Sequence, residues 1–435
     1  MDKITRYLIL VFIIIIFIIL APLIVIYVSG KNVQLGNLLA KDTGIIDIQS
    51  SPSGAEVYID GVKNNTTPTT VRFVKQGIHN IEVSKNGFRT WKKNLFIEAG
   101  KVTYAGTLAN EVKLLPDETP LLLSSSNVES YAILDDDIIF HAPNNQLIKY
   151  SLSDKKNILQ AELPSEISNI ENTNNKKYLS AFTKNGNNIL IDTQTLKLVN
   201  LPEALTADVS SLYIDDDDNI LAIKDRKLIF CNLNNSQAVP LLENALAFTI
   251  NNNLLYATSW NNGEIKIDTY LWDGTTLTIQ GNLLTQKLAL GKNYKLWLTY
   301  QKELFLLADE DFYRVNQKLD LLNKNVKSVQ LDKIHRQLTY QTLSEIYYYN
   351  FISNKTELFY RTSQITEPSL VVPNIGYGFV ANQNGLNAVE IDNRNGQNNY
   401  AFVTGSSISK IAITNDENTL IFLDNNKLYT ITISK

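Results

Sequence analysis

Hydrophobic and polar residues follow three different patterns along the chain. Residues 7–28 contain no charged side chain and are almost entirely apolar. From residue 44 onward, apolar and polar residues alternate in short runs separated by Gly, Pro, Asn and Asp, which is the pattern of β-strands joined by turns. From residue 114 these runs also recur at a regular spacing. The sequence therefore predicts one N-terminal helix followed by a mainly β protein.

The first pattern predicts a transmembrane helix over residues 7–28. At about 1.5 Å per residue this run extends about 33 Å, enough for a hydrocarbon layer of about 30 Å. Lys3 and Arg6 precede the run and only Lys31 follows it closely, so we expect residues 1–6 to form a cytoplasmic tip. A cleaved signal peptide is the alternative, because Ser29 and Gly30 follow the run, although its apolar region is longer than signal peptides usually have. Residues 29–43 are expected to be a linker, and everything after them to be extracytoplasmic.

The second pattern predicts a small β-sandwich over residues 44–113. The alternating runs are 45–49, 55–60, 69–74, 79–85 and 93–99. The turns between them have a physical basis, since Pro52 presets φ before Gly54, and Gly61 after Asp60 permits positive φ in a hairpin. Two such sheets, facing each other, bury the apolar half of each strand.

This segment resembles the PEGA domain family. The resemblance is carried, in order, by Ser51-Pro52-Ser53-Gly54-Ala55, Val57-Tyr58-Ile59-Asp60-Gly61, Thr67-Pro68, Gly77-Ile78-His79, Lys85-Asn86-Gly87-Phe88 and Trp91. Ser53 departs from the Glu that the family name implies, and Phe88 from the more usual Tyr. The resemblance implies an extracytoplasmic, non-catalytic domain found in bacterial and archaeal surface proteins. An anchor, this domain and a long β region together are also similar in architecture to envelope proteins of small-genome bacteria.

The third pattern predicts a β-propeller over residues 114–435. Eight hairpins recur, formed by residues 138–142 with 147–152, 178–183 with 188–193, 220–224 with 228–233, 254–260 with 264–272, 295–300 with 303–308, 337–341 with 345–351, 376–381 with 386–391, and 419–423 with 427–433. Each is expected to supply the second and third strands of a four-stranded blade. The first strands are expected to begin near Tyr131, Ile167, Val209, Ala245, Gln286, Val326, Ser369 and Ile408, at steps of 36 to 43 residues.

The last repeat ends with three strands at Lys435, and residues 120–123 are expected to supply its fourth strand and close the ring. Eight blades are therefore predicted, with seven as the alternative if one repeat is misread. A pair of two-sheet sandwiches is the other fold considered. The repeats resemble those of the Trp-Asp propeller superfamily. The resemblance is one of architecture alone, because neither the Trp-Asp dipeptide nor a sialidase-type Asp box recurs.

Composition excludes several classes of site. The chain has one Cys and three His, which excludes a disulfide framework and a zinc site of clustered thiolates and imidazoles. The net charge of the chain is −4, and residues 1–113 are net positive. The propeller region is therefore more negative than the chain as a whole. Nucleic acid is therefore not expected as a partner. The sequence contains no glycine-rich phosphate-binding loop, and no cofactor is expected.

Acidic runs are interpreted as turns. Asp215–Asp218 could hold calcium, but it occupies the same turn of the repeat as Asp135–Asp137 and Asn251–Asn253, and the D-x-D-x-D-G spacing is missing. Residues 392–396 fail the same test because Arg394 replaces an oxygen ligand, so this segment is interpreted as a loop. No metal ligand is therefore predicted.

No catalytic residue is predicted either. His79, His141 and His335 are scattered and lack a local Ser, Cys or Asp pattern, and Cys231 lies in a strand-like run typical of a buried core thiol. Among the aromatic residues, Tyr347 and Tyr349 are expected to share one strand face and pack against a neighbouring blade. Trp272, Tyr377 and Trp260 could contact a sugar or a protein, and only Trp260 is expected to be exposed. Ligand-binding residues remain unassigned.

The sequence thus predicts a non-catalytic, membrane-anchored cell-envelope protein whose propeller binds or scaffolds a protein or wall glycan. The alternative is an extracytoplasmic hydrolase or lyase acting on glycans, with its site at the propeller channel. An acidic pair ringed by aromatic residues and Arg would favour the enzyme. A channel lined by Ser, Asn and aliphatic residues would favour the scaffold. A signalling role is disfavoured, since six residues before the helix cannot form a signalling domain.

Overall fold

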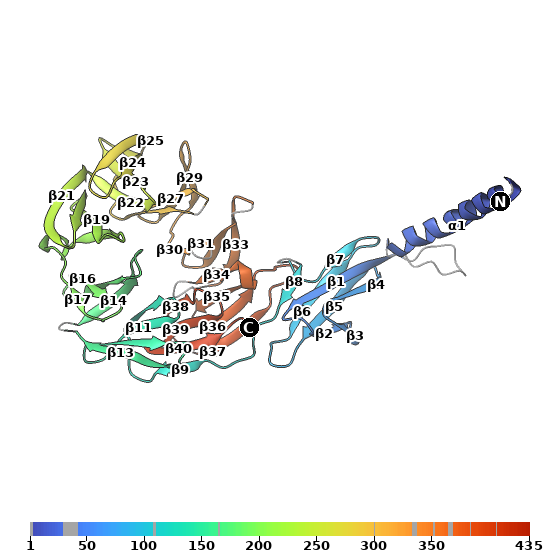
Figure 1. Ribbon diagram of the computed structural model, residues 1–435. Coiled ribbons are helices and arrows are strands. Elements are labelled where there is room, and N and C mark those ends of the chain that lie inside the picture. The colour runs from blue at the N-terminus through green and yellow to red at the C-terminus, as the bar shows by residue number, and fades with distance from the viewer. Residues whose placement is uncertain are drawn as a thin grey trace.

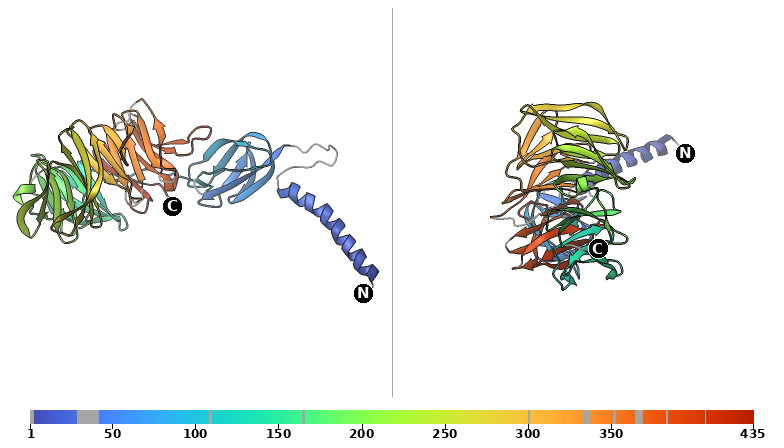
Figure 2. Two further views of the ribbon diagram at one scale, coloured as in Figure 1. Left: turned by 90° about the horizontal axis from the view of Figure 1, so that it is seen from above. Right: turned by 90° about the vertical axis from the view of Figure 1, so that its left-hand side faces the viewer.

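The computed structural model describes residues 3–28, 42–107, 110–163, 166–299, 301–332, 337–350, 353–363, 369–382, 384–405 and 407–435. Helix α1 (Lys3–Val28) lies at one end, a β-sandwich follows it, and a ring of sheets lies at the far end (Figures 1 and 2). Over the described residues, no helix is found that is both long and apolar enough to cross a membrane. Most of the predicted linker, residues 29–41, falls outside the described residues, and Thr43 already belongs to the first strand.

The β-sandwich contains two four-stranded sheets. One sheet has the order β4-β1-β7, with β8 also paired to β1, and comprises β1 (Thr43–Ser51), β4 (Thr69–Lys75), β7 (Val102–Tyr104) and β8 (Glu111–Lys113). The other has the order β3-β2-β5-β6 and comprises β2 (Glu56–Ile59), β3 (Val62–Thr66), β5 (Gly77–Ser84) and β6 (Trp91–Ile97). Asp60 and Gly61 both have positive φ, as the tight β2–β3 hairpin requires. Ile46, Val57 and Ile81 are fully buried between the sheets, so alternation along the strands builds the core.

Among the described residues, the segment from 121 to 435 forms eight further four-stranded sheets, in agreement with the eight predicted repeats. The first four are β10 (Ser130–Leu134), β11 (Asp137–Ala142), β12 (Gln146–Ser151), β13 (Lys156–Glu162); β14 (Ile167–Asn172), β15 (Tyr178–Thr183), β16 (Asn188–Asp192), β17 (Leu198–Val199); β18 (Val209–Ile214), β19 (Asn219–Lys224), β20 (Lys227–Asn232), β21 (Asn235–Glu243); and β22 (Ala245–Asn251), β23 (Leu254–Asn261), β24 (Glu264–Trp272), β25 (Leu277–Lys287). Two short 3-10 helices, η1 (Glu203–Leu205) and η2 (Pro373–Ile375), lie in connections.

The other four sheets are β26 (Tyr294–Leu298), β27 (Leu304–Ala308), β28 (Asp311–Val315), β29 (Leu319–Asn323); β30 (Ser328–Asp332), β31 (Gln337–Gln341), β32 (Glu345–Asn350), β33 (Lys355–Arg361); β34 (Leu370–Val372), β35 (Tyr377–Asn382), β36 (Gly385–Glu390), β37 (Asn399–Thr404); and β38 (Ile408–Ile413), β39 (Thr419–Asp424), β40 (Lys427–Thr432) with β9 (Leu121–Ser124). We number these sheets as blades one to eight in chain order.

The predicted strand order of the fifth repeat is wrong by one strand. Residues 295–300 were expected to form the second strand of that blade, but they overlap β26, which is its first strand. Gln286, expected to begin the blade, lies instead in β25, the outer strand of blade four. The cause is the length of β25, which has 11 residues and two register shifts, so its apolar alternation runs on to where a new blade was expected.

The ring closes as the sequence predicts. β9 pairs with β40, so the strand that precedes the first repeat completes the last blade. The sheets of blades one and eight also share a hydrophobic cluster that contains Tyr131, Ile138, Ile421 and Leu423. The Tyr131 hydroxyl donates to the backbone carbonyl of Ile421 at 3.0 Å. This contact fixes the two ends of the repeat region against each other.

Candidate functional site

A pocket of about 260 Å³ lies along the first strands of four consecutive blades. It is lined by residues 172–174, 211–213, 248–250 and 295–297, which belong to or directly follow β14, β18, β22 and β26. The first strand of a propeller blade faces the central channel, so this pocket is the channel wall of blades two to five.

The pocket wall carries hydroxyl, amide, aromatic and aliphatic groups. Among its lining residues none has a carboxylate, and Lys295 is the one that carries a formal charge. The amides are already engaged between blades: Asn172 Nδ2 donates to the carbonyl of Ile133 at 3.0 Å, and Asn174 Oδ1 accepts from the backbone N–H of Ile214 at 2.8 Å. The residues that line this pocket therefore do not include a carboxylate pair of the kind that glycoside hydrolysis uses.

A second lysine, on blade eight, contacts the backbone of blades one and two. Lys410, on β38 of blade eight, donates to the carbonyls of Tyr131 at 2.7 Å and Ile170 at 3.4 Å. Its ammonium also lies 4.9 Å from the centre of the Tyr131 ring. Burial lowers the pKa of Lys410, while Glu171 opposes that shift. Because carbonyl oxygens already solvate this ammonium, it serves to join blades rather than to bind a ligand.

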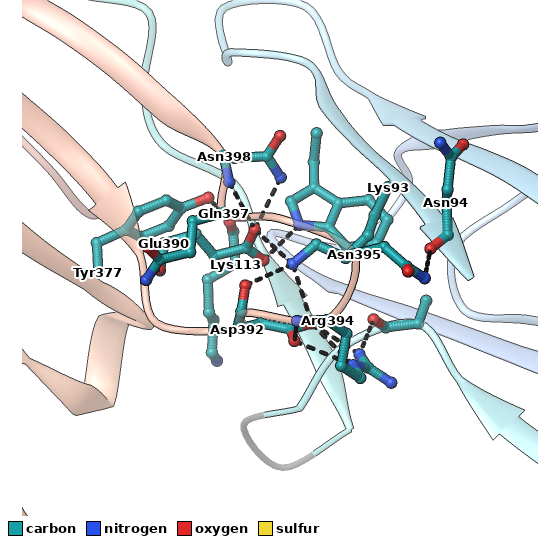
Figure 3. Close-up of polar contacts among 12 residues, drawn as sticks. Lys93, Asn94, Lys113, Tyr377, Glu390, Asp392, Arg394, Asn395, Gln397 and Asn398 are labelled. Carbon is teal, nitrogen blue, oxygen red and sulfur yellow. Dashed lines mark hydrogen bonds and ion pairs between the residues drawn. The ribbon is translucent and has the colours of Figure 1, made fainter. Parts of the chain in front are cut away.

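The largest set of buried charged contacts lies elsewhere, where the sandwich meets blade seven (Figure 3). The β36–β37 loop, residues 391–398, inserts between β6 of one sheet of the sandwich and β7 of the other. Arg394 donates to the carbonyls of Tyr104 at 3.0 Å and Ala105 at 2.8 Å. On the other side, Asn395 Nδ2 donates to the carbonyl of Asn94. We call this contact the domain junction.

Lys93 is the centre of the domain junction. Its side chain is 1 % exposed, and its ammonium lies 2.9 Å from Glu390 Oε2 and 3.2 Å from Asp392 Oδ2. It also donates to the backbone carbonyl of Asp392 at 2.7 Å. The indole N–H of Trp91 donates to the other Glu390 oxygen, Oε1, at 2.7 Å. Two residues of β6 and two acidic residues about 300 positions later in the chain therefore form one buried hydrogen-bonded network.

The electrostatics of this network are balanced by a second cation. Burial raises the pKa of Asp392, but hydrogen bonds from Arg394 and the charges of Lys93 and Arg394 outweigh it, so the pKa lies below its ordinary value. Arg394 Nε and Nη2 contact the Asp392 carboxylate at 2.8 to 3.1 Å. Asn398 Nδ2 donates to Glu390 Oε2 at 2.8 Å. The Asp392 carboxylate is thus held ionised, and both carboxylates have close hydrogen-bond and ion-pair partners, as a buried structural contact requires.

Arg89 covers the edge of the junction nearest the propeller. Its guanidinium lies 4.9 Å from the ring centre of Phe402 and 5.8 Å from that of Tyr400, and Nη1 donates to the carbonyl of Ala401 at 2.9 Å. The Tyr400 hydroxyl donates to the carbonyl of Thr90 at 3.0 Å. The junction therefore combines ion pairs, aromatic packing and backbone hydrogen bonds, which together fix the orientation of the two domains.

A cavity of about 220 Å³ beside the junction contains two carboxylates in its wall, those of Glu357 and Asp392. Both are occupied by other groups of the protein. Glu357 accepts from the Tyr348 hydroxyl at 2.5 Å and from Asn350 Nδ2 at 2.8 Å, and Asp392 is bonded to Lys93 and Arg394 as above. Both carboxylates of this cavity therefore already have hydrogen-bond or ion-pair partners within the protein.

The acidic runs lie in turns, as interpreted from the sequence. Asp215 Oδ1 accepts from the backbone N–H groups of Asp217 and Asn219, both at 2.9 Å. Asp218 is bonded by Lys177 Nζ at 2.8 and 2.9 Å, and its pKa is lowered because these contacts outweigh the effect of burial. Asp135 is paired with Lys176. Over the described residues, no group of three or more His, Cys, Asp or Glu side chains is placed to hold a metal ion.

Neither the cysteine nor a histidine among the described residues lines the pocket. His79 on β5 bonds Asp60 Oδ2 through Nδ1 and the carbonyl of Lys75 through Nε2, both at 2.7 Å. His141 on β11 is 4 % exposed, and burial lowers its pKa. Cys231 is fully buried on β20, and burial raises its pKa to about 11, so its thiol is inert. His335 lies outside the described residues.

The aromatic residues pack largely as expected. Tyr347 and Tyr349 share a face of β32 and pack with Phe305 and Phe312 of blade five, which confirms the prediction. Trp272 is buried.

Two other aromatic residues, Trp260 and Tyr377, have contacts that the sequence did not predict. Trp260 is half-buried rather than exposed, because its indole N–H donates to the carbonyl of Leu288 at 3.1 Å and its ring packs on blade five. Tyr377, which is 1 % exposed, donates from its hydroxyl to the carbonyl of Lys113 at 3.0 Å, so it belongs to the domain junction.

Sequence reasoning missed the domain junction itself. Residues 392–396 were correctly interpreted as a loop, but their contact with the sandwich was not anticipated. The available signal was Lys93, a charged residue at an inward-facing position of β6 between buried Trp91 and Leu95. A charge at a core position requires a partner, although its location cannot be derived from the strand pattern.

Comparison with known proteins supports both β regions. Residues 43–111 match the PEGA domain family, which confirms the resemblance seen in the sequence. The crystal structure of the C-terminal WD40 domain of Sif2 is similar at 11% identity and a TM-score of 0.52, covering 73% of this chain and 99% of that one. The computationally designed Ika8 protein (11% identity, TM-score 0.49, 71% of this chain and 97% of that one) and a eukaryotic initiation factor (11%, 0.47, 71% and 86%) are also similar. No curated protein matches the chain.

Proposed function

We propose that this protein is a non-catalytic cell-envelope protein that is anchored in the membrane by α1 and binds a wall glycan or protein partner through its propeller. The observation that carries the binding role is the channel pocket, whose wall offers hydroxyl, aromatic and ammonium groups and, among its lining residues, no carboxylate. A propeller-like β fold joined to a PEGA domain agrees with a binding or scaffolding role.

Membrane anchoring is supported by the composition and exposure of the N-terminal segment. The support comes from the sequence, in which residues 7–28 carry no charge and would extend about 33 Å as a helix, whereas only part of this segment has side chains among those that the structure describes. Its apolar side chains from Tyr7 to Leu20 are all exposed, between 38 and 71 %. An exposed apolar surface of this extent is unstable in water and needs a lipid or protein partner. Lys3 and Arg6, which precede this segment, support an orientation with the N-terminus in the cytoplasm and the β domains outside.

The PEGA domain would then act as a rigid stem. It lies between α1 and the propeller (Figure 1), and the domain junction fixes its orientation relative to blade seven. A stem of this kind holds the propeller away from the membrane at a defined angle.

The alternative derived from the sequence is catalysis by a carboxylate pair. It lacks support in the channel pocket, whose lining residues include no carboxylate, and the two carboxylates beside the junction already bond other groups of the protein.

A retention assay tests the proposed role. Full-length protein in detergent micelles is immobilised and exposed to purified wall glycan and, separately, to a solubilised envelope extract, with empty micelles as the control. We expect retention of the glycan or of a specific envelope protein. Retention of neither would contradict the binding role. Release of soluble glycan fragments during the incubation would contradict the non-catalytic part of the proposal.

A further inference from the structure

Several polar groups of the channel pocket remain available, and the one that carries a charge, the ammonium of Lys295, is a hydrogen-bond donor. No hydrogen bond or ion pair joins the ammonium of Lys295, the hydroxyls of Ser211 and Thr249, or the indole N–H of Trp297 to another described residue. By contrast, Asn172 Nδ2 and both polar atoms of the Asn174 amide bond neighbouring blades. A wall that offers an ammonium and several N–H and O–H groups, with carboxylates absent from its lining residues, is complementary to an anionic ligand rich in acceptors.

The aromatic side chains of the pocket add a second constraint. Tyr213 on β18, Phe248 on β22 and Trp297 on β26 lie on successive blades, and each is half-buried, so part of each ring remains accessible. Rings of this kind form an apolar surface with a polar edge. The volume of about 260 Å³ is below that of pockets for drug-sized ligands, so it suits a single residue of a longer chain.

From these observations we infer that the pocket binds an acidic sugar residue of an extended glycan, with the sugar carboxylate paired to Lys295 and the ring against Trp297. The inference rests on the proposed binding function and names the ligand class for its site. A sugar residue fits these groups because one face of its ring is apolar and can lie on an aromatic side chain, while its hydroxyl groups can exchange hydrogen bonds with the hydroxyls of Ser211 and Thr249.

The test compares two lysine variants. Binding of an oligogalacturonate to the full-length protein in detergent is measured by titration calorimetry, with the fully methyl-esterified, uncharged oligomer as the ligand control. Lys295→Met removes the charge in the pocket. Lys292→Met removes an exposed charge three residues earlier that does not line the pocket and serves as the matched control.

We expect the acidic oligomer to bind the wild type and Lys292→Met alike and to bind Lys295→Met about tenfold more weakly, the usual effect of losing one charge-assisted hydrogen bond. Trp297→Leu should weaken the binding of the acidic and the esterified oligomer alike. Unchanged melting temperatures would show that each variant is folded.

Two results would overturn the inference. One is equal affinity of Lys295→Met and Lys292→Met for the acidic oligomer, or no binding of that oligomer to the wild type. The other is a preference for a peptide with a free C-terminal carboxylate over the sugar. If the retention assay still captured an envelope component in either case, the binding function would stand and the assignment of this pocket would fall. Failure of both assays would remove the proposed function as well.

Discussion

At the scale of single residues, the charge of Lys93 has the largest structural consequence. Its ammonium neutralises Glu390 and Asp392 in a place where the side chains are 1, 9 and 4 % exposed. Burying such charges costs free energy that only close pairing offsets. The network therefore makes the junction specific more than it makes it stable, because no other arrangement of the two domains would pair these groups.

Replacing Lys93 by Met should destabilise the protein strongly. The substitution leaves two carboxylates buried beside one remaining cation, Arg394, and removing one partner from a buried pair typically costs about 3–5 kcal/mol. The matched control is Lys92→Met. Lys92 is the adjacent residue on β6, its side chain is 57 % exposed, and its surface pair with Glu82 is worth at most about 1 kcal/mol.

Urea unfolding of the full-length protein, followed by circular dichroism, measures both effects. A fall in the unfolding midpoint for Lys93→Met that Lys92→Met does not share is the expected result. Equal midpoints for the two variants would mean that the domain junction does not hold the domains together.

Prediction from the sequence succeeded for residues whose structural role depends on their near neighbours in the chain. The turn role of Asp215 follows from backbone N–H groups two and four residues away, and the shared face of Tyr347 and Tyr349 follows from strand periodicity. It failed for the partners of Lys93, because Glu390 and Asp392 are about 300 residues away and no local pattern specifies that distance.

At the scale of elements, the closure of blade eight is the feature on which the ring depends. β9 precedes the first blade in sequence yet pairs with β40, so both ends of the repeat region contribute to one sheet. Closure ties the segment that precedes blade one into blade eight, so the two ends of the ring cannot separate without breaking the β9–β40 hydrogen bonds. The sequence predicted this closure from a missing fourth strand. The sequence-based prediction of blade five was wrong, because β25 is longer than the other outer strands. No Gly or Pro marks the position at which its alternation of apolar and polar residues ends.

A double substitution in β9 tests the closure. Successive backbone N–H groups of a strand point to opposite edges, so Leu121→Pro with Leu122→Pro removes the donor that faces β40. We expect a melting temperature several degrees lower and faster amide exchange in β40. The control is Leu121→Ala with Leu122→Ala, which removes the same side chains and keeps both donors. If the proline and alanine variants had the same melting temperature and exchange rates, β9 would not be needed to close the ring.

At the scale of the whole molecule, three parts follow one another in space as they do in sequence: the apolar helix, the PEGA domain and the propeller (Figure 2). The junction residues make the last two parts one unit, and the pocket on blades two to five lies away from blade seven, which contacts the stem. None of the residues that line the pocket belongs to the PEGA domain. The proposed role depends on that unit lying outside the cell.

The most direct test of this account is the location of the C-terminus relative to the membrane. An epitope tag placed after Lys435 is probed in intact cells with an added protease that cannot cross the membrane, and again after the cells are lysed. The account predicts that the tag is lost from intact cells while the protein is recovered in the membrane fraction. A tag that is cleaved only after lysis, or full-length protein recovered in the soluble cytosolic fraction, would contradict it.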